Sequence, residues 1–155
     1  MVYVKRDVPS SKLVLAGPDE GIITKLKEYA VKRGIDLRYL GVVSEDEKHK
    51  LYSECRVFAH PALYEPYGIT LLEAQAFGKP CVITGEGRQL YVASPGKTSV
   101  YAEPNPRSYA KAISILLMDR YLYMKLSVNA KAWASQHIWS KILPKYEWLY
   151  SKLIS

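Results

Sequence analysis

Two carboxylates and one glycine form the stretch with the clearest capacity for chemistry in this sequence. Glu65 lies in an expected loop after an apolar strand-like run, Gly68 begins a helix-forming segment, and Glu73 lies inside that segment. The free N–H groups at a helix start attract anions, and a glycine there lets a ligand approach the backbone closely. A strand, a loop carboxylate, a glycine and a helix with a second carboxylate together predict a binding site for a phosphate ester.

The segment after Gly68 has the composition of a buried helix. Its apolar residues cover nearly the whole helix circumference; they are Ile69, Leu71, Leu72, Ala74, Ala76 and Phe77. Glu73 is its only charge, and because a buried carboxylate is unfavourable without a partner, Glu73 should be paired. The plainer alternative is that Glu65 is a solvated loop residue and that Glu73 pairs with a lysine.

A hydrolase with a pair of carboxylates is a further alternative. Eight helical positions separate two groups by roughly 12 Å along the helix axis, whereas a retaining glycosidase needs about 5–5.5 Å between its carboxyl groups. The loop position of Glu65 leaves the distance open, but the spacing does not favour this chemistry. His60, at the end of the preceding strand, could act as a base or contact the ligand, although a histidine merely satisfied at a strand end is the simpler interpretation.

The elements that must position these residues alternate between strands and helices. Strands are expected over residues 12–16, 37–40, 56–60, 80–84 and 99–102. Helices are expected over 20–33, 44–54, 68 onward, 88–93, 107–118, 120–136 and 140–153, with a turn at 85–87 and an interruption near Pro144. Ser44 and Glu47 form a capping-box signature at the start of the second helix.

This alternation predicts an α/β fold with a doubly wound parallel sheet and additional C-terminal helices. In such sheets, ligands bind at the carboxyl ends of the strands. Gly17, Gly41 and the loop at residues 64–68 all follow expected strands, so they should share that edge of the sheet.

Length and composition narrow the class of protein. The 155 residues predict one domain, residues 12–155, after a leader or linker stub at residues 1–11. No apolar run is long enough to span a membrane and no secretory signal is evident, so we expect a cytoplasmic protein. The net charge of +7 suggests a polyanionic partner, but the basic residues are dispersed, which argues against nucleic acid. Cys55 and Cys81 are expected to be buried free thiols.

These residues, in this order, resemble the C-terminal domain of a family 4 (group 1) retaining glycosyltransferase, one Rossmann-like half of a two-domain GT-B enzyme. The resemblance covers about residues 12–153. It rests on Leu40-Gly41-Val42-Val43-Ser44 before a helix that contains Leu51-Tyr52, on Glu65-Pro66-Tyr67-Gly68-Ile69-Thr70-Leu71-Leu72-Glu73-Ala74, on Phe77-Gly78-Lys79-Pro80 and on Glu103-Pro104. Such a domain holds the nucleotide-sugar donor of a hexosyltransferase-like enzyme, and the family needs no metal or other cofactor.

The resemblance also implies roles for single residues. Glu65, the candidate catalytic residue, would contact hydroxyls of the transferred sugar, with Tyr67 and Gly68 beside it. Backbone N–H groups of Gly68, Ile69 and Thr70 would hold the diphosphate.

The other implied roles concern the nucleoside. Glu73 would hydrogen-bond the ribose hydroxyls, which would give this carboxylate the partner that it needs. The backbone of Gly41, Val42 and Val43 would line the base, and Gly17 would give the donor room.

Two departures from the family pattern indicate an incomplete enzyme. The Arg and Lys that usually bind the diphosphate, and the whole acceptor-binding N-terminal domain, precede the expected first strand and are absent here. A Gly-Gly-x-x-Glu turn is replaced by Gly85-Glu86-Gly87-Arg88-Gln89-Leu90.

The alternative function is therefore a non-catalytic nucleotide-binding module that pairs with a separate acceptor-binding half. The last helix could rest on a membrane surface, but packing across the domain junction, as in the resembling enzymes, is preferred.

Overall fold

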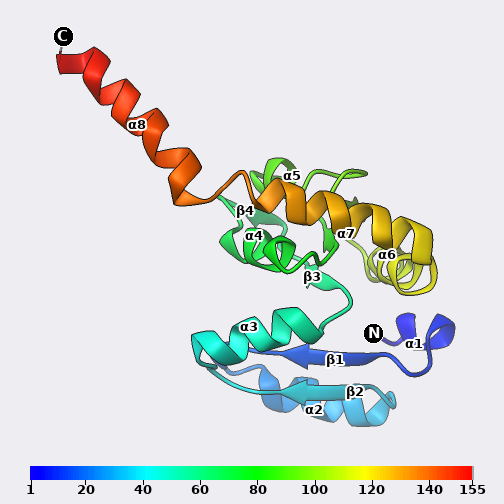
Figure 1. Cartoon of the computed structure of the whole chain (residues 1–155). Coiled ribbons are helices and arrows are strands. Elements are labelled where there is room, and N and C mark those ends of the chain that lie inside the picture. The colour runs from blue at the N-terminus through cyan, green and yellow to red at the C-terminus, as the bar shows by residue number, and fades with distance from the viewer. Residues whose placement is uncertain (155) are drawn as a thin grey trace.

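The computed structural model describes residues 1–154, and its layers of parallel strands and helices confirm the predicted α/β class (Figure 1). The strands form three hydrogen-bonded sheets, and each strand pair within the described residues is parallel. Strands β1 (Lys12–Leu15) and β2 (Asp36–Tyr39) form one sheet, and β4 (Tyr64–Glu65) and β6 (Glu86–Gly87) another. The third sheet has the order β3 (Phe58–His60), β5 (Cys81–Ile83), β7 (Ser99–Tyr101).

Strand β5 is the centre of the core. Its three residues are all fully buried, and successive side chains of a strand point to opposite faces. Cys81 and Ile83 accordingly pack in one cluster, with Leu71 and Ala74, while Val82 packs in a second cluster with Leu116. Because helices cover both faces of the sheet at β5, all three residues of this strand are apolar.

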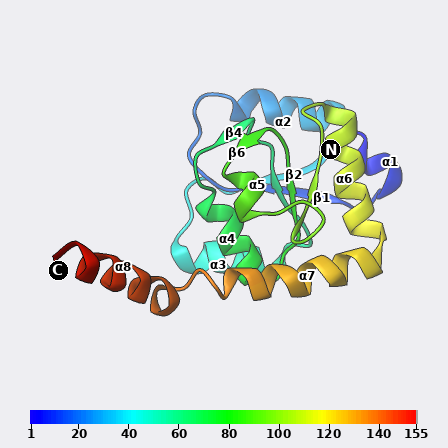
Figure 2. The same cartoon turned by 90° about the horizontal axis from the view of Figure 1, so that it is seen from above.

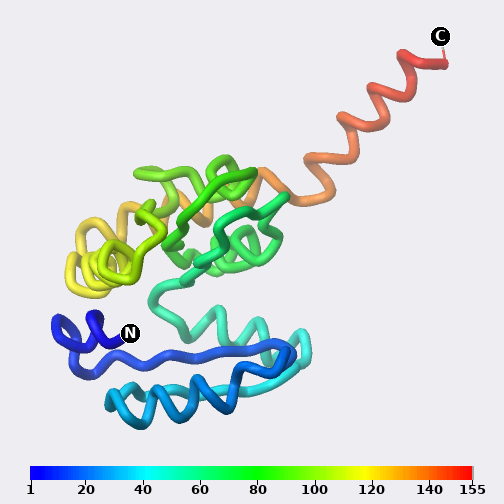
Figure 3. Tube along the Cα trace, turned by 180° about the vertical axis from the view of Figure 1, so that it is seen from behind, coloured from blue at the N-terminus to red at the C-terminus, as the bar shows by residue number. Residues whose placement is uncertain are grey.

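The helices surround these sheets. Their bounds are α1 (Val4–Asp7), α2 (Ile23–Lys32), α3 (Glu45–Glu54), α4 (Ile69–Ala76), α5 (Gln89–Val92), α6 (Pro106–Met118), α7 (Arg120–Ala134) and α8 (Trp139–Ile154). The predicted capping box is confirmed, since Ser44 and Glu47 exchange side-chain and backbone hydrogen bonds at the start of α3. Figures 1 and 3 show α3 on the side of the β1–β2 sheet that faces α4, with α2 on the opposite side. Helix α3 is thereby placed next to α4.

Several expectations differ from the structure. Residues 1–11, expected to be a leader or linker stub, contain α1, whose Val4 is fully buried and which contacts α6. The prediction of a turn over residues 85–87 is wrong, because Glu86–Gly87 form strand β6 and pair with β4. Only a glycine permits this approach: a Cβ on Gly87 would lie 2.6 Å from the backbone oxygen of Glu65. Both cysteines are free, but only Cys81 is buried.

Helix α8 extends away from the other elements. Figure 2 shows α7 running along one side of the molecule and α8 continuing beyond it to the C-terminal end. The predicted interruption at Pro144 is wrong: the helix continues through it, because the exposed carbonyl that loses its hydrogen bond can be solvated. Over residues 139–154 no side chain is buried. Within residues 1–154, no helix has the length and apolar character that crossing a membrane requires.

Candidate functional site

Helix α4 begins with a left-handed glycine followed by two backbone N–H groups that have no acceptor in the described part of the chain. Gly68 is its N-cap, with a left-handed φ of 89°, and a Cβ there would lie 2.8 Å from Cδ1 of Leu71. Glycine is therefore required for both conformation and space. Among residues 1–154, the N–H groups of Ile69 and Thr70 have no hydrogen-bond acceptor, as expected for the first turn of a helix. These donors can hold an anion.

Glu65 occupies the turn just before this helix. Its Oε1 accepts hydrogen bonds from the backbone N–H groups of Tyr67 at 3.2 Å and Gly68 at 3.0 Å. Its Oε2 lies 3.3 Å from Nε2 of His60, at the end of β3. The side chain of Glu65 is about one-quarter exposed, so it is not a freely solvated loop carboxylate. The structure thus brings Glu65, Tyr67 and Gly68 together, and His60 joins them.

Helix α4 is less buried than its composition predicts. Leu71, Ala74 and Gln75 are buried, but Ile69 is 64% exposed and Phe77 39% exposed. The expectation of a helix buried all round is therefore wrong. The physical reason is that neighbouring elements cover only the inner face of α4, where it contacts α7, α5 and β5.

Glu73, on the more open part of α4, is held by two side chains of α3. Nζ of Lys48 lies 2.9 Å from Oε1 of Glu73, and the hydroxyl of Tyr52 donates to Oε2 at 2.9 Å. Glu73 is 28% exposed, so it is paired but also accessible. The expected need for a partner is confirmed, and the lysine pairing of the plainer alternative is present as well. Each oxygen of Glu73 accepts only one of these hydrogen bonds and has a second lone pair, so the carboxylate can also accept hydrogen bonds from a ligand.

The protonation states of Lys48 and Tyr52 make both side chains hydrogen-bond donors to Glu73. Burial, followed by the hydrogen bond to Glu73, raises the pKa of Tyr52, so its hydroxyl stays protonated at neutral pH and donates. Hydrogen bonds to Glu45 and Glu73 raise the pKa of Lys48, which stays charged. The cluster therefore surrounds the carboxylate of Glu73 with two donors, one of them charged.

The two glycines predicted at the donor edge lie side by side. The N–H of Gly17 donates to the carbonyl of Gly41 at 2.8 Å, and the hydroxyl of Tyr39 donates to the carbonyl of Gly17 at 2.8 Å. They follow β1 and β2, with φ of 135° and 68°. Of the residues predicted next to them, Val42 is 79% exposed and Val43 is half-buried. This edge is open to solvent.

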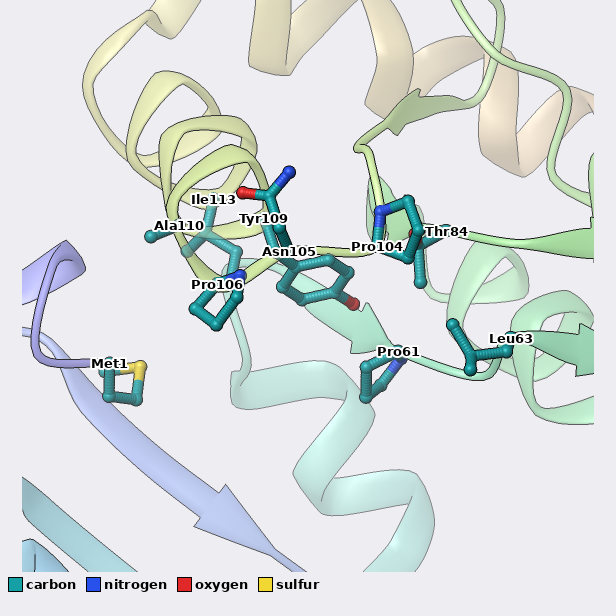
Figure 4. A pocket seen from close by; sticks show the side chains of 10 residues that line it. All are labelled: Met1, Pro61, Leu63, Thr84, Pro104, Asn105, Pro106, Tyr109, Ala110 and Ile113. Carbon is teal, nitrogen blue, oxygen red and sulfur yellow. The ribbon is translucent and has the colours of Figure 1, made fainter.

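A separate cavity of about 290 Å³ lies beyond the carboxyl ends of β3, β5 and β7 (Figure 4). Its lining consists of Met1, Pro61, Leu63, Thr84, Pro104, Asn105, Pro106, Tyr109, Ala110 and Ile113. It contains none of the predicted site residues and no charged side chain. Figure 4 shows the ring of Tyr109 among the prolines, and its hydroxyl donates to the carbonyl of Val82 at 2.9 Å. The cavity suits an apolar group and offers no acid–base chemistry.

Sequence reasoning missed Lys48 and Tyr52 as members of the site. Their spacing of four residues after a capping box places both on one face of α3. That signal shows that they point the same way, but not that this face meets α4.

Comparison with known proteins identifies the family. Residues 1–133 match the family described as glycosyl transferases group 1. An uncharacterised glycosyltransferase of Methanocaldococcus jannaschii is 30% identical over 142 residues, which cover 90% of this chain and 34% of that protein.

Two solved structures share the fold. Sucrose-phosphate synthase from Thermosynechococcus elongatus has a TM-score of 0.84 and 22% identity, covering 99% of this chain and 41% of that one. Anabaena HepE in complex with UDP has a TM-score of 0.81 and 22% identity, covering 96% of this chain and 44% of that one. This chain spans less than half the length of these proteins. Because the family match covers most of its residues, this chain belongs to the group 1 glycosyl transferases.

Proposed function

We propose that this chain is the donor-binding domain of a retaining, metal-independent glycosyltransferase that uses a nucleoside diphosphate sugar. The observation that carries this proposal is the start of α4, where free backbone donors lie in the same loop-and-helix unit as two anchored carboxylates. A related fold, that of HepE, is known in complex with UDP. A diphosphate is the anion that suits the helix start, since its charge is favourable there.

Each part of the donor has a candidate partner in this proposal. The N–H groups of Ile69 and Thr70 hold the diphosphate and stabilise it as a leaving group while negative charge develops on it. Gly68 was also predicted as a diphosphate donor, but its N–H donates to Glu65, so its part is to leave room for the ligand beside the backbone. Glu73 accepts hydrogen bonds from the ribose.

Glu65 and the β1–β2 edge serve the two ends of the donor. Glu65 accepts hydrogen bonds from hydroxyls of the transferred sugar, next to Tyr67. Gly17, Gly41, Val42 and Val43 line the base.

The exposed side of α8 supports a second domain as the partner of this one. Its large apolar residues are Trp139, Leu143, Tyr146, Trp148, Leu149, Tyr150, Leu153 and Ile154, each at least 46% exposed. This chain spans 34% of the M. jannaschii relative, so most of that protein lies outside the matched region. We assign the exposed apolar surface of α8 to contact with an acceptor-binding domain. Binding of the chain to anionic lipid vesicles, lost when Trp148 and Leu153 are replaced by Ser, would instead assign it to a membrane.

Ligand-observed NMR of the folded chain tests the donor site. UDP, GDP and ADP are compared with their common sugar conjugates, with the free nucleosides and with inorganic pyrophosphate. We expect selective binding of one nucleoside diphosphate, unchanged by a chelator such as EDTA. Binding of none of these compounds by a folded sample would overturn the proposal, and loss of binding with EDTA would overturn its metal independence.

A transfer assay separates the enzyme from a non-catalytic module. We expect the chain to bind its donor but to transfer little sugar alone, because acceptor-binding residues are not part of the site described here. Restoration of transfer on addition of an acceptor-binding domain from a family member would support the enzyme. Donor binding without transfer in any such combination would support the module.

A further inference from the structure

Two side chains of α3 hold the carboxylate of Glu73 from the same side. Lys48 and Tyr52 lie four residues apart, which places them on one face of the helix. Lys48 contacts Oε1 and Tyr52 donates to Oε2, each at 2.9 Å. Since each partner takes a different oxygen, the rotation of the carboxylate group is fixed by both contacts.

The hydroxyl of Tyr52 is itself held in place. Tyr52 is 6% exposed, and its ring lies edge-on to Phe58 at 5.5 Å and stacked on Phe77 at 5.9 Å between centroids. Lys48 divides its contacts between Glu73 and Glu45, whose Oε2 lies 2.8 Å away. The buried phenol therefore supplies orientation, while the lysine supplies orientation and a neutralising charge.

The free acceptor sites of Glu73 match a pair of neighbouring hydroxyls. An ionised carboxylate has about four lone-pair sites on two oxygens. The contacts from α3 use one site on each oxygen and leave one on each, on a side chain that is 28% exposed. Two acceptor oxygens on one carbon suit two hydroxyls on neighbouring carbons, which is what the 2′- and 3′-hydroxyls of a ribose provide.

We infer that Tyr52 and Lys48 are positioning residues that direct Glu73 toward both ribose hydroxyls, and so make this site select ribonucleotides over deoxyribonucleotides. This inference rests on the proposed function, because it needs a nucleoside diphosphate at α4. It adds a source of selectivity on α3, outside the Glu65–Glu73 stretch. The selectivity is expected to depend on the Tyr52 hydroxyl rather than on its ring.

The test compares three ligands: the nucleoside diphosphate that the chain prefers, its 2′-deoxy form and its 2′,3′-dideoxy form. Tyr52→Phe keeps the packed ring and removes only the hydroxyl. We expect it to weaken the ribonucleotide by about tenfold, the size of a hydrogen bond to a charged group, and the dideoxy form by less than about twofold. Lys48→Met should also lower the ribo-to-dideoxy preference. Glu45→Gln is the matched control, because it removes the charge of the other partner of Lys48 and should leave the preference unchanged.

Dissociation constants and thermal unfolding are measured for every variant. Equal losses for all three nucleotides would show a merely structural role and overturn the inference, as would an unchanged preference in Tyr52→Phe. If Tyr52→Phe does not fold, Lys48→Met and Lys48→Gln decide in the same way. A wild-type chain that binds all three nucleotides equally overturns the inference but leaves diphosphate binding intact. A wild-type chain that binds none overturns the proposed function itself.

Discussion

The two carboxylates of the candidate site are held by opposite means. Glu65 is held locally, by backbone N–H groups two and three residues further along the chain, and it lies next to His60. Glu73 is fixed by side chains of another helix, more than twenty residues earlier in the chain. One carboxylate therefore depends on the shape of its own loop, and the other on how α3 packs against α4.

This difference separates what each carboxylate can contribute. A carboxylate held by a turn follows the turn, so Glu65 can adjust when a sugar arrives. A carboxylate held between a buried phenol and a lysine has little freedom, so Glu73 is better suited to an invariant part of the ligand. The ribose is the same in every ribonucleotide donor, whereas the sugar varies.

The largest effect is expected for the rigidly held carboxylate. Glu73→Ala should weaken binding of a bare nucleoside diphosphate by about 10- to 100-fold, because it removes an ionised acceptor for two hydroxyls. Titration calorimetry of the folded variant measures this. Glu54→Ala, at an exposed carboxylate of α3 paired with Lys50, is the control and should leave binding unchanged. Equal affinities of Glu73→Ala and wild type would contradict the ribose role.

Glu65 can be disturbed by replacing Gly68, whose backbone N–H it accepts from. Gly68→Ala should lower the free energy of unfolding by about 1–2 kcal/mol for the left-handed conformation, and by more because the new Cβ crowds Leu71. Gly96→Ala is a matched control: its φ is 74°, but no described atom lies within 4 Å of the added Cβ. Denaturant unfolding of both variants compares them. If Gly96→Ala is as destabilising as Gly68→Ala, the start of α4 is not crowded.

The smallest effect is expected for Glu65 itself. Glu65→Ala should weaken binding of the nucleotide sugar by about three- to tenfold, since it removes an acceptor for sugar hydroxyls, and leave the bare nucleotide unchanged. Parallel titrations with the two ligands measure the difference. Equal losses for both ligands would mean that Glu65 supports the loop and does not read the sugar.

The sequence could predict the locally encoded parts of this protein. The Ser44–Glu47 capping box, the glycine before α4 and the central strand at Cys81–Ile83 follow from neighbouring residues, and each is present in the structure. The fold class followed from the same alternation of strands and helices.

Features that depend on distant packing could not be predicted in this way. Nothing near Glu73 in the chain indicates that Lys48 and Tyr52 are its partners, because that depends on how α3 meets α4. The two-residue strand at Glu86–Gly87 exists only because β4 lies beside it. Apolar content likewise overstated the burial of α4, since composition does not show which face of a helix is covered.

Helix α8 has a consequence for the cooperativity of unfolding. A 16-residue helix without buried side chains is marginal in water, and Pro144 removes one of its hydrogen bonds. Its amide protons should therefore exchange by local opening, while those of the fully buried β5 should exchange only when the whole fold opens. Because melting α8 exposes little new surface, the denaturant dependence of unfolding should correspond to a domain that ends before Trp139.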